Sequence, residues 1–184
     1  MTTKLKVINL FATCGAGKST IAAGLFHHMK IHGYSVELIS EYAKQMVWEQ
    51  RNTNHFKNQA YITSKQHNKQ LHLSNHDIDF CITDSPLPLS LVYTPEDYFP
   101  SFTPLVWEMY NSYDNYNVVL IPSHDYQVVG RNQTVEESKA VQDKMLELLT
   151  INNVPYKIYN THFYSHLDIF ADVYTKWVQN GDNK

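Results

Sequence analysis

Short apolar runs alternate along the chain with longer stretches in which apolar residues recur every three or four positions. The short runs predict strands at residues 4–11, 35–40, 78–83, 117–121 and 154–159. The longer stretches predict helices at residues 19–31, 41–50, 55–75, 105–113, 134–151 and 165–178. This alternation is typical of an α/β protein in which helices cover both faces of a parallel sheet.

Two segments interrupt the alternation. Residues 89–104 carry three prolines and predict an irregular, aromatic-bearing excursion. Residues 122–137 are mostly polar and predict a lid-like loop. The chain shows no internal repeat and no low-complexity linker, and its 184 residues are enough to bury a full core. We therefore expect a single domain over residues 1–184.

Composition narrows the partners that this domain is expected to have. The formal net charge of −3 gives no general basic field of the kind that binds nucleic acid or a membrane surface. The apolar runs are far shorter than a membrane-spanning helix. Two cysteines, Cys14 and Cys81, are too few for a disulfide framework. We expect a reduced, cytoplasmic protein with no membrane partner, while the oligomeric state, a homodimer included, stays open.

The most specific motif lies between the first predicted strand and the first predicted helix. It is the lysine end of a P-loop (Walker A), Cys14-Gly15-Ala16-Gly17-Lys18-Ser19-Thr20. Backbone N–H groups of such a loop converge on phosphate oxygens, and the following helix presents its positive N-terminal end to them. We expect residues 14–20 to bind a nucleotide, with Lys18 at the β- and γ-phosphates and the Ser19 hydroxyl on Mg²⁺.

One position departs from the P-loop pattern, because Ala12 stands where the first glycine is expected. Alanine has only a methyl group more than glycine, so a position without a positive φ can accept it. The alternative is a chance match in a loop that contains glycine. The strand before the motif and the amphipathic helix after it favour a nucleotide site.

Charged residues follow the other predicted strands, and the carboxyl ends of parallel strands form one edge of a sheet. Asp84 follows the third strand as a Walker B carboxylate does and is expected to hold Mg²⁺; the alternative is a turn aspartate. Glu41 follows the second strand and is expected to take a proton from an acceptor hydroxyl; the alternative is an acid in the first turn of a helix. Arg131, in the lid-like loop, is expected to neutralise charge on the transferring phosphoryl group; the alternative is a solvated arginine.

The long predicted helix at residues 55–75 carries two sets of polar residues. Three glutamines lie along one side of it, and a solvated face is a better interpretation for them than an amide that reads a base or ribose: Gln59, Gln66 and Gln70. Three lysines predict a basic stripe on the same helix: Lys57, Lys65 and Lys69.

The order of these motifs resembles the P-loop nucleoside and nucleotide kinases, most of all the ribosylnicotinamide kinase-like small kinase domains of bacteria and phages. Ser40-Glu41-Tyr42-Ala43-Lys44 is similar to the Glu-Tyr-Ala-Arg segment of that group, and Thr83-Asp84-Ser85-Pro86 to its Asp-Thr segment. Val129-Gly130-Arg131 is similar to its lid arginine. The resemblance covers residues 4–177 and implies a five-stranded parallel sheet of order 2-3-1-4-5, ATP and Mg²⁺ as the donor pair and a nucleoside-like acceptor.

The sequence thus predicts an ATP- and Mg²⁺-dependent phosphotransferase that acts on a nucleoside, a nucleotide or a related small acceptor. One alternative is a kinase for a hydroxyl on nucleic acid, either a 5′-end or a hydroxymethylated base in phage DNA. Aromatic residues at 93–113 and the lysine stripe are the features that would serve it. Another alternative is a non-catalytic nucleotide-binding switch or ATPase module. The identity of the acceptor and the choice of ATP or GTP as donor stay open.

Overall fold

The computed structural model describes residues 4–13, 15–122 and 135–179 of the chain. Its sheet has five parallel strands in the order β2-β3-β1-β4-β5, which confirms the predicted fold class and strand order. The strands are β1 (Lys6–Phe11), β2 (Val36–Ile39), β3 (Phe80–Thr83), β4 (Asp114–Pro122) and β5 (Lys157–Thr161).

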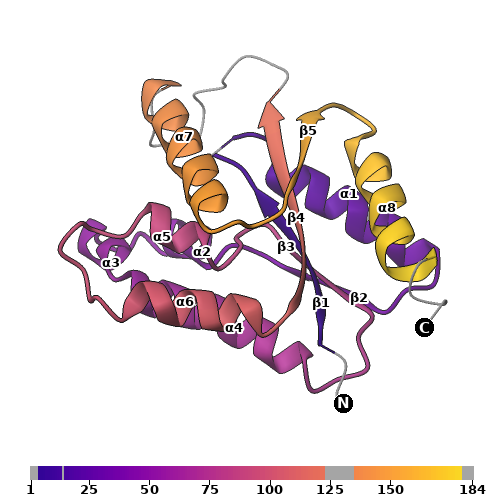
Figure 1. Cartoon of the computed structure of the whole chain (residues 1–184), viewed down its shortest axis with the longest axis horizontal. Coiled ribbons are helices and arrows are strands. Elements are labelled where there is room, and N and C mark those ends of the chain that lie inside the picture. Colours follow the sequence, from indigo (N-terminus) through magenta and orange to yellow (C-terminus); the bar gives the residue numbers. More distant parts are fainter. Residues whose placement is uncertain (1–3, 14, 123–134, 180–184) are drawn as a thin grey trace.

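Helices cover both faces of the sheet, as Figure 1 shows. One face is covered by α1 (Lys18–Ile31) and α8 (Ser165–Tyr174), which continues as the short π-helix η1 (Thr175–Gln179). On the other side lie α2 (Tyr42–Trp48), α3 (Thr53–Lys57), α4 (Gln59–Leu73), α5 (Leu89–Val92), α6 (Phe102–Asn111) and α7 (Val135–Ile151). Among the described helices, none is long and apolar enough to cross a membrane.

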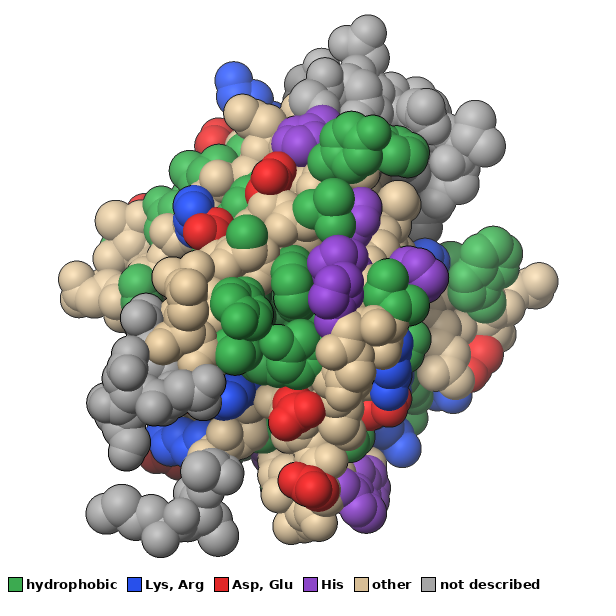
Figure 2. Space-filling model, turned by 90° about the vertical axis from the view of Figure 1, so that its right-hand side faces the viewer, with side chains coloured by type: hydrophobic (Ala, Val, Ile, Leu, Met, Phe, Trp, Pro, Cys, Tyr) green, Lys and Arg blue, Asp and Glu red, His purple; other side chains and the backbone are tan. Residues whose placement is uncertain are grey.

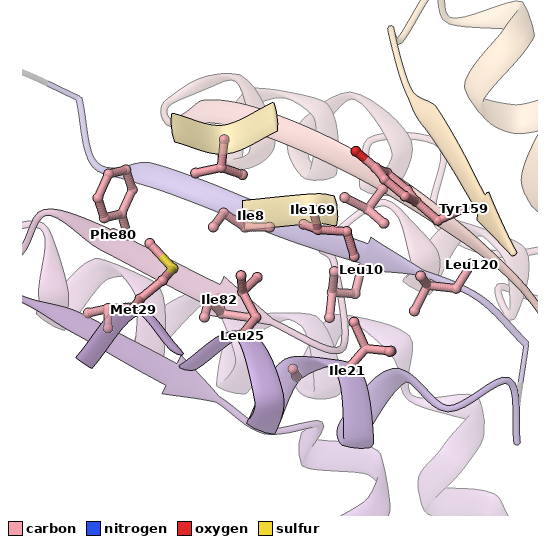
Figure 3. Packing of buried hydrophobic residues seen from close by; sticks show 14 of the residues in the cluster. Ile8, Leu10, Ile21, Leu25, Met29, Phe80, Ile82, Leu120, Tyr159 and Ile169 are labelled. Carbon is pink, nitrogen blue, oxygen red and sulfur yellow. The ribbon is translucent and has the colours of Figure 1, made fainter. Parts of the chain in front are cut away.

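The core under α1 and α8 explains why the strands read as continuous apolar runs. Ile8, Leu10 and Ile82 of the sheet are fully or almost fully buried and belong to one cluster with Leu25 and Met29 of α1 (Figure 3). A parallel strand with helices on both faces buries both sets of its side chains, so apolar residues do not alternate with polar ones. All four residues of β3 are buried for this reason.

The opposite face of the sheet has its own packing. Val7 and Cys81 form a cluster with Val106 of α6, while Val119 packs with Met145 of α7. Because both faces are closed, the exposed functional groups of such a sheet are confined to the ends of its strands.

Histidine side chains gather on the side of α1 and α8 that Figure 2 shows. The ring of His28 lies 4.3 Å from that of His32 and 6.4 Å from that of His166, measured between centroids. It also meets Phe170 edge-on. Burial, with His32 and His166 nearby, lowers the pKa of His28. The histidine rings and Phe170 thus contact one another where α1 packs against α8.

The structure differs from the predicted elements in several places, among them β5, which spans Lys157–Thr161 instead of residues 154–159. The predicted helix 55–75 is divided at Asn58, whose side-chain oxygen accepts a hydrogen bond from the Tyr61 backbone and starts α4. The excursion at 89–104 contains the short helix α5, and α6 begins before Pro104 because proline is tolerated in the first helical turn. Strand β4 begins at Asp114, earlier than predicted, since its polar start pairs with β1.

Candidate active site

The loop between β1 and α1 has the backbone of a phosphate-binding loop. Gly15 and Gly17 have φ values of 81° and 84°, in the left-handed region that glycine adopts at little cost. Gly17 directly precedes α1, so the N-terminal end of a 14-residue helix faces this loop. Ala12 is buried and is not among the residues with positive φ, as expected for a position that accepts a methyl group.

Lys18 lies across the start of the loop. Its Nζ donates hydrogen bonds to the backbone oxygen of Ala12 at 2.8 Å and to that of Thr13 at 2.9 Å. Phosphate oxygens are charged acceptors and form stronger hydrogen bonds than these neutral carbonyls. The ammonium group is therefore held at the P-loop and can exchange carbonyl partners for phosphate oxygens.

A hydrogen bond joins the first turn of α1 to the end of β3. The Ser19 hydroxyl donates to Oδ2 of Asp84 over 2.9 Å. Asp84 is only 4% exposed, and its other carboxylate oxygen, Oδ1, is buried with no hydrogen-bond partner among the described residues. A hydroxyl beside a carboxylate with an unused oxygen is the kind of hard ligand set that Mg²⁺ prefers, so these two residues fit the metal.

Glu41 is the residue that precedes α2, and its backbone has φ −59° and ψ 122°. Burial raises the pKa of its carboxyl group, and the nearby carboxylate of Asp84 raises it further, whereas Lys18 and Lys44 lower it. Glu41 is thus in electrostatic contact with both Lys18 and Asp84. The structure brings these predicted residues together, and a carboxyl group with a raised pKa is suited to taking a proton.

The interpretation of the three glutamines as a solvated face is wrong. All three are at least 94% buried: Gln59, Gln66 and Gln70. They share a stripe of α4 with Ile62 and Thr63, and this stripe faces the rest of the protein. Their spacing relative to Ile62 was the available signal, because residues three and four apart lie on the same helix face.

Two side chains of α4 contact the segment around Glu41. Gln66 accepts a hydrogen bond from the backbone N–H of Tyr42, and Lys69 donates one to the backbone oxygen of Ser40 at 3.1 Å. Burial lowers the pKa of Lys69. Lys69 is therefore not a free charge of a basic stripe, although Lys65 of the same helix is exposed.

Some predicted site residues lie outside the part of the chain that the structure describes. These are Cys14 and Arg131, together with residues 123–134 of the lid-like loop. Their roles stay predictions. Of the other P-loop residues, Ala16 is buried against the core, and Thr20 is exposed on α1.

A sheet of this order, with a glycine-lysine-serine loop after its first strand and an acid after its third, defines a P-loop kinase fold. Residues 7–165 match the family model described as an AAA domain, and the chain belongs to this family. This match and the fold of the solved structures described next support the expected resemblance to the P-loop kinase superfamily. No curated protein matches the sequence.

Solved structures share the fold at low sequence identity. The NadR protein in complex with NAD and AMP-PNP has a TM-score of 0.71 and 13% identity, over 93% of this chain and 49% of that one. NadR in complex with NR has a TM-score of 0.67 and 15% identity, over 84% and 45%. Thymidylate kinase from Ehrlichia chaffeensis has a TM-score of 0.64 and 12% identity, over 92% and 99%. The chain thus spans about half the length of the NadR structures.

Proposed function

We propose that this protein is an ATP- and Mg²⁺-dependent phosphotransferase that acts on a nucleoside, a nucleotide or a related small acceptor. The observation that carries the proposal is the hydrogen bond from Ser19 to Asp84, which joins a P-loop to a buried carboxylate whose other oxygen has no hydrogen-bond partner in the described part of the chain. Support also comes from the fold neighbours, which are NadR in complex with NAD and AMP-PNP, NadR in complex with NR, and a thymidylate kinase.

The P-loop would bind the phosphate donor. Its backbone N–H groups and the N-terminal end of α1 would bind the phosphates, and Lys18 would exchange its carbonyl partners for their oxygens. Ser19 and Asp84 would hold Mg²⁺, which supplies positive charge to the phosphate oxygens when it is bound. The described residues thus gather the groups that neutralise charge during transfer.

Glu41 would act on the acceptor. Its raised pKa lets the carboxylate take a proton from an acceptor hydroxyl more readily than an ordinary glutamate would. A switch that only binds nucleotide has no need of a second buried carboxyl group beside the metal-binding one. This second acid favours transfer to an acceptor over binding alone.

A small acceptor is favoured over a nucleic-acid strand. Strand binding needs lysine side chains that are free to contact phosphates. Of the three lysines of the expected stripe, Lys57 and Lys65 are exposed but Lys69 is bonded to a backbone oxygen, and the protein as a whole is acidic.

An aromatic pair at the same edge of the sheet offers a surface for the donor base. Phe163 and Tyr164 follow β5, with side chains that are 82% and 59% exposed. Their rings meet edge-on with centroids 4.9 Å apart. We assign them the role of a stacking platform, since exposed aromatic rings stack on bases of any identity.

The test is transfer of radiolabelled γ-phosphate from ATP with Mg²⁺ to a panel of nucleosides, nucleoside monophosphates, ribosylnicotinamide and DNA that carries hydroxymethylated bases. We expect label in one class of small acceptor. The variant Lys18→Met should transfer about 10²–10³-fold more slowly, as expected for loss of a group that stabilises transition-state charge. Lys30→Met, which removes an exposed lysine of the same helix, is the control. Label in DNA alone would overturn the small acceptor, and hydrolysis at one rate with every acceptor would overturn the proposal itself.

A further inference from the structure

We propose that Gln66 is a positioning residue that holds the segments bearing Glu41 and Asp84 at a fixed spacing. The inference deepens the proposed function and rests on it. It starts from one buried side-chain amide, which contacts the chain beside each of the two acids.

The amide of Gln66 makes two hydrogen bonds to different strand ends. Its Oε1 accepts from the backbone N–H of Tyr42 at 3.1 Å, and its Nε2 donates to Oγ1 of Thr83 at 3.2 Å. The orientation of the amide follows from chemistry, because a backbone N–H can only donate and must therefore face the amide oxygen. Tyr42 directly follows Glu41, and Thr83 directly precedes Asp84.

Both acids are held on two sides. The hydroxyl oxygen of Thr83 also accepts from the backbone N–H of Ser85, so the residues before and after Asp84 are joined through it. On the other acid, Lys69 lies three positions after Gln66 on the same helix and bonds the backbone oxygen of Ser40. Helix α4 thus contacts the peptide groups before and after Glu41.

The two acids need such support because their like charges repel each other. They follow neighbouring parallel strands, β2 and β3, so the two carboxylates lie at adjacent strand ends. Helix α2 gives little rigidity of its own, since it has seven residues and starts without a side-chain cap from Glu41. Isolated helices of this length are unstable, so its position depends on outside contacts such as the one from Gln66.

Loss of this contact should act on turnover rather than on substrate binding. A displacement of about 1 Å at reacting groups can cost about 10²-fold in rate. For Gln66→Met, which preserves bulk and removes both hydrogen bonds, we expect kcat to fall about 10–100-fold, with the KM values for ATP and the acceptor within about twofold of wild type.

The control is Gln70→Met. Gln70 lies on the same helix, is 1% exposed, and its Oε1 has no hydrogen-bond partner among the described residues. Its replacement should leave kcat within about twofold of wild type. An equal fall in kcat for Gln66→Met and Gln70→Met would show a general effect of helix packing and would overturn the proposal.

A second variant, Thr83→Val, breaks the contact from the side of Asp84. If Gln66 and Thr83 act through their shared hydrogen bond, the double variant should lose clearly less activity than the product of the two single losses. Multiplied losses would overturn the proposal. A rise in the acceptor KM alone in Gln66→Met would also overturn it, since it would make Gln66 a residue that reads the acceptor.

Amide hydrogen exchange gives a readout that does not depend on turnover. The Tyr42 amide should exchange at least about tenfold faster in Gln66→Met and at the wild-type rate in Gln70→Met, because its buried hydrogen bond is lost only in the first. If wild-type protein transfers phosphate to no acceptor, the proposed function fails. The exchange measurement still decides whether Gln66 holds α2, and unchanged protection of Tyr42 would overturn the inference.

Discussion

The replacement Asp84→Asn tests whether the buried carboxylate serves metal binding rather than stability. In a structural turn, a buried aspartate is kept because it stabilises the fold, and its loss destabilises the protein. Asp84 has one bonded oxygen and one that has no hydrogen-bond partner within residues 4–13, 15–122 and 135–179, and it lies near another acid. A residue in such surroundings costs stability until a cation binds.

The magnitude follows from two opposing changes. The hydrogen bond from Ser19 becomes neutral instead of charged, which weakens it by about 1 kcal/mol. Removal of a buried charge from the neighbourhood of Glu41 recovers part of a desolvation penalty of several kcal/mol. We expect a net gain of about 1–2 kcal/mol in the free energy of unfolding without ligand, and at 2–4 °C per kcal/mol for a protein of this size the melting temperature should rise by about 2–8 °C.

The assay is thermal unfolding of wild type and Asp84→Asn, each alone, with a non-hydrolysable ATP analogue and with the analogue plus Mg²⁺. In wild type, Mg²⁺ should add a further rise in melting temperature, because a ligand that binds only the folded state stabilises it. In Asp84→Asn this Mg²⁺-dependent increment should vanish. Asp143→Asn, an exposed acid of α7, should change neither quantity. A lower melting temperature for Asp84→Asn without ligand, or an intact Mg²⁺ increment, would refute the reasoning.

Three further predictions concern the same edge of the sheet. Because the pKa of Glu41 is raised, its contribution to stability is present below the ordinary glutamate pKa and is lost as pH rises through the folded value. Glu41→Gln should therefore melt higher than wild type at pH 8 but not at pH 4, and kcat should fall about 10²–10⁴-fold. Phe163→Ala should raise the KM for ATP at least about fivefold, with kcat unchanged, if its ring stacks on the base. Gly17→Ala and Gly33→Ala meet the same φ of +84° in open space, so each should lose about 1–2 kcal/mol in unfolding, but only Gly17→Ala should weaken nucleotide binding in calorimetry.

Much of the fold could be predicted because its strands are short and buried on both faces. A strand such as β3, with four buried residues, can be recognised from its continuous apolar run, without alternation of apolar and polar residues. The P-loop motif places the first strand before it and the first helix after it. The polar start of β4 was not readable in this way. Asn115 lies before the predicted start of the strand at Asn117, and the side-chain amide of Asn9 donates to both residues, at 2.8 and 3.1 Å. Such a network depends on the pairing of β1 with β4, which no local pattern shows.

The candidate site also contains residues that could be predicted from the sequence and residues that could not. Lys18, Ser19 and Asp84 were predictable because each follows a strand end, and strand ends of a parallel sheet meet. The helical spacing relative to Ile62 indicates the buried face of α4, but the hydrogen bonds of Gln66 could not be predicted from local sequence, because its two partners lie 24 and 17 residues away. A glutamine on a helix is exposed in most proteins, and the packing of α4 against the strand ends reverses that expectation here.

The three variants at the acids and at Gln66 together distinguish a functional site from a structural one. If Glu41 and Asp84 were an ordinary helix cap and turn residue, removal of either charge would weaken the fold, and Gln66 would be one buried amide among several. A site that binds Mg²⁺ and transfers a phosphoryl group predicts the opposite effects on stability. Loss of either acid should stabilise the ligand-free protein, whereas loss of Gln66 leaves the Tyr42 amide buried without its acceptor and should destabilise it. All three should lower turnover. Stability and activity then change in opposite directions at the acids and in the same direction at Gln66, a pattern that packing alone does not produce.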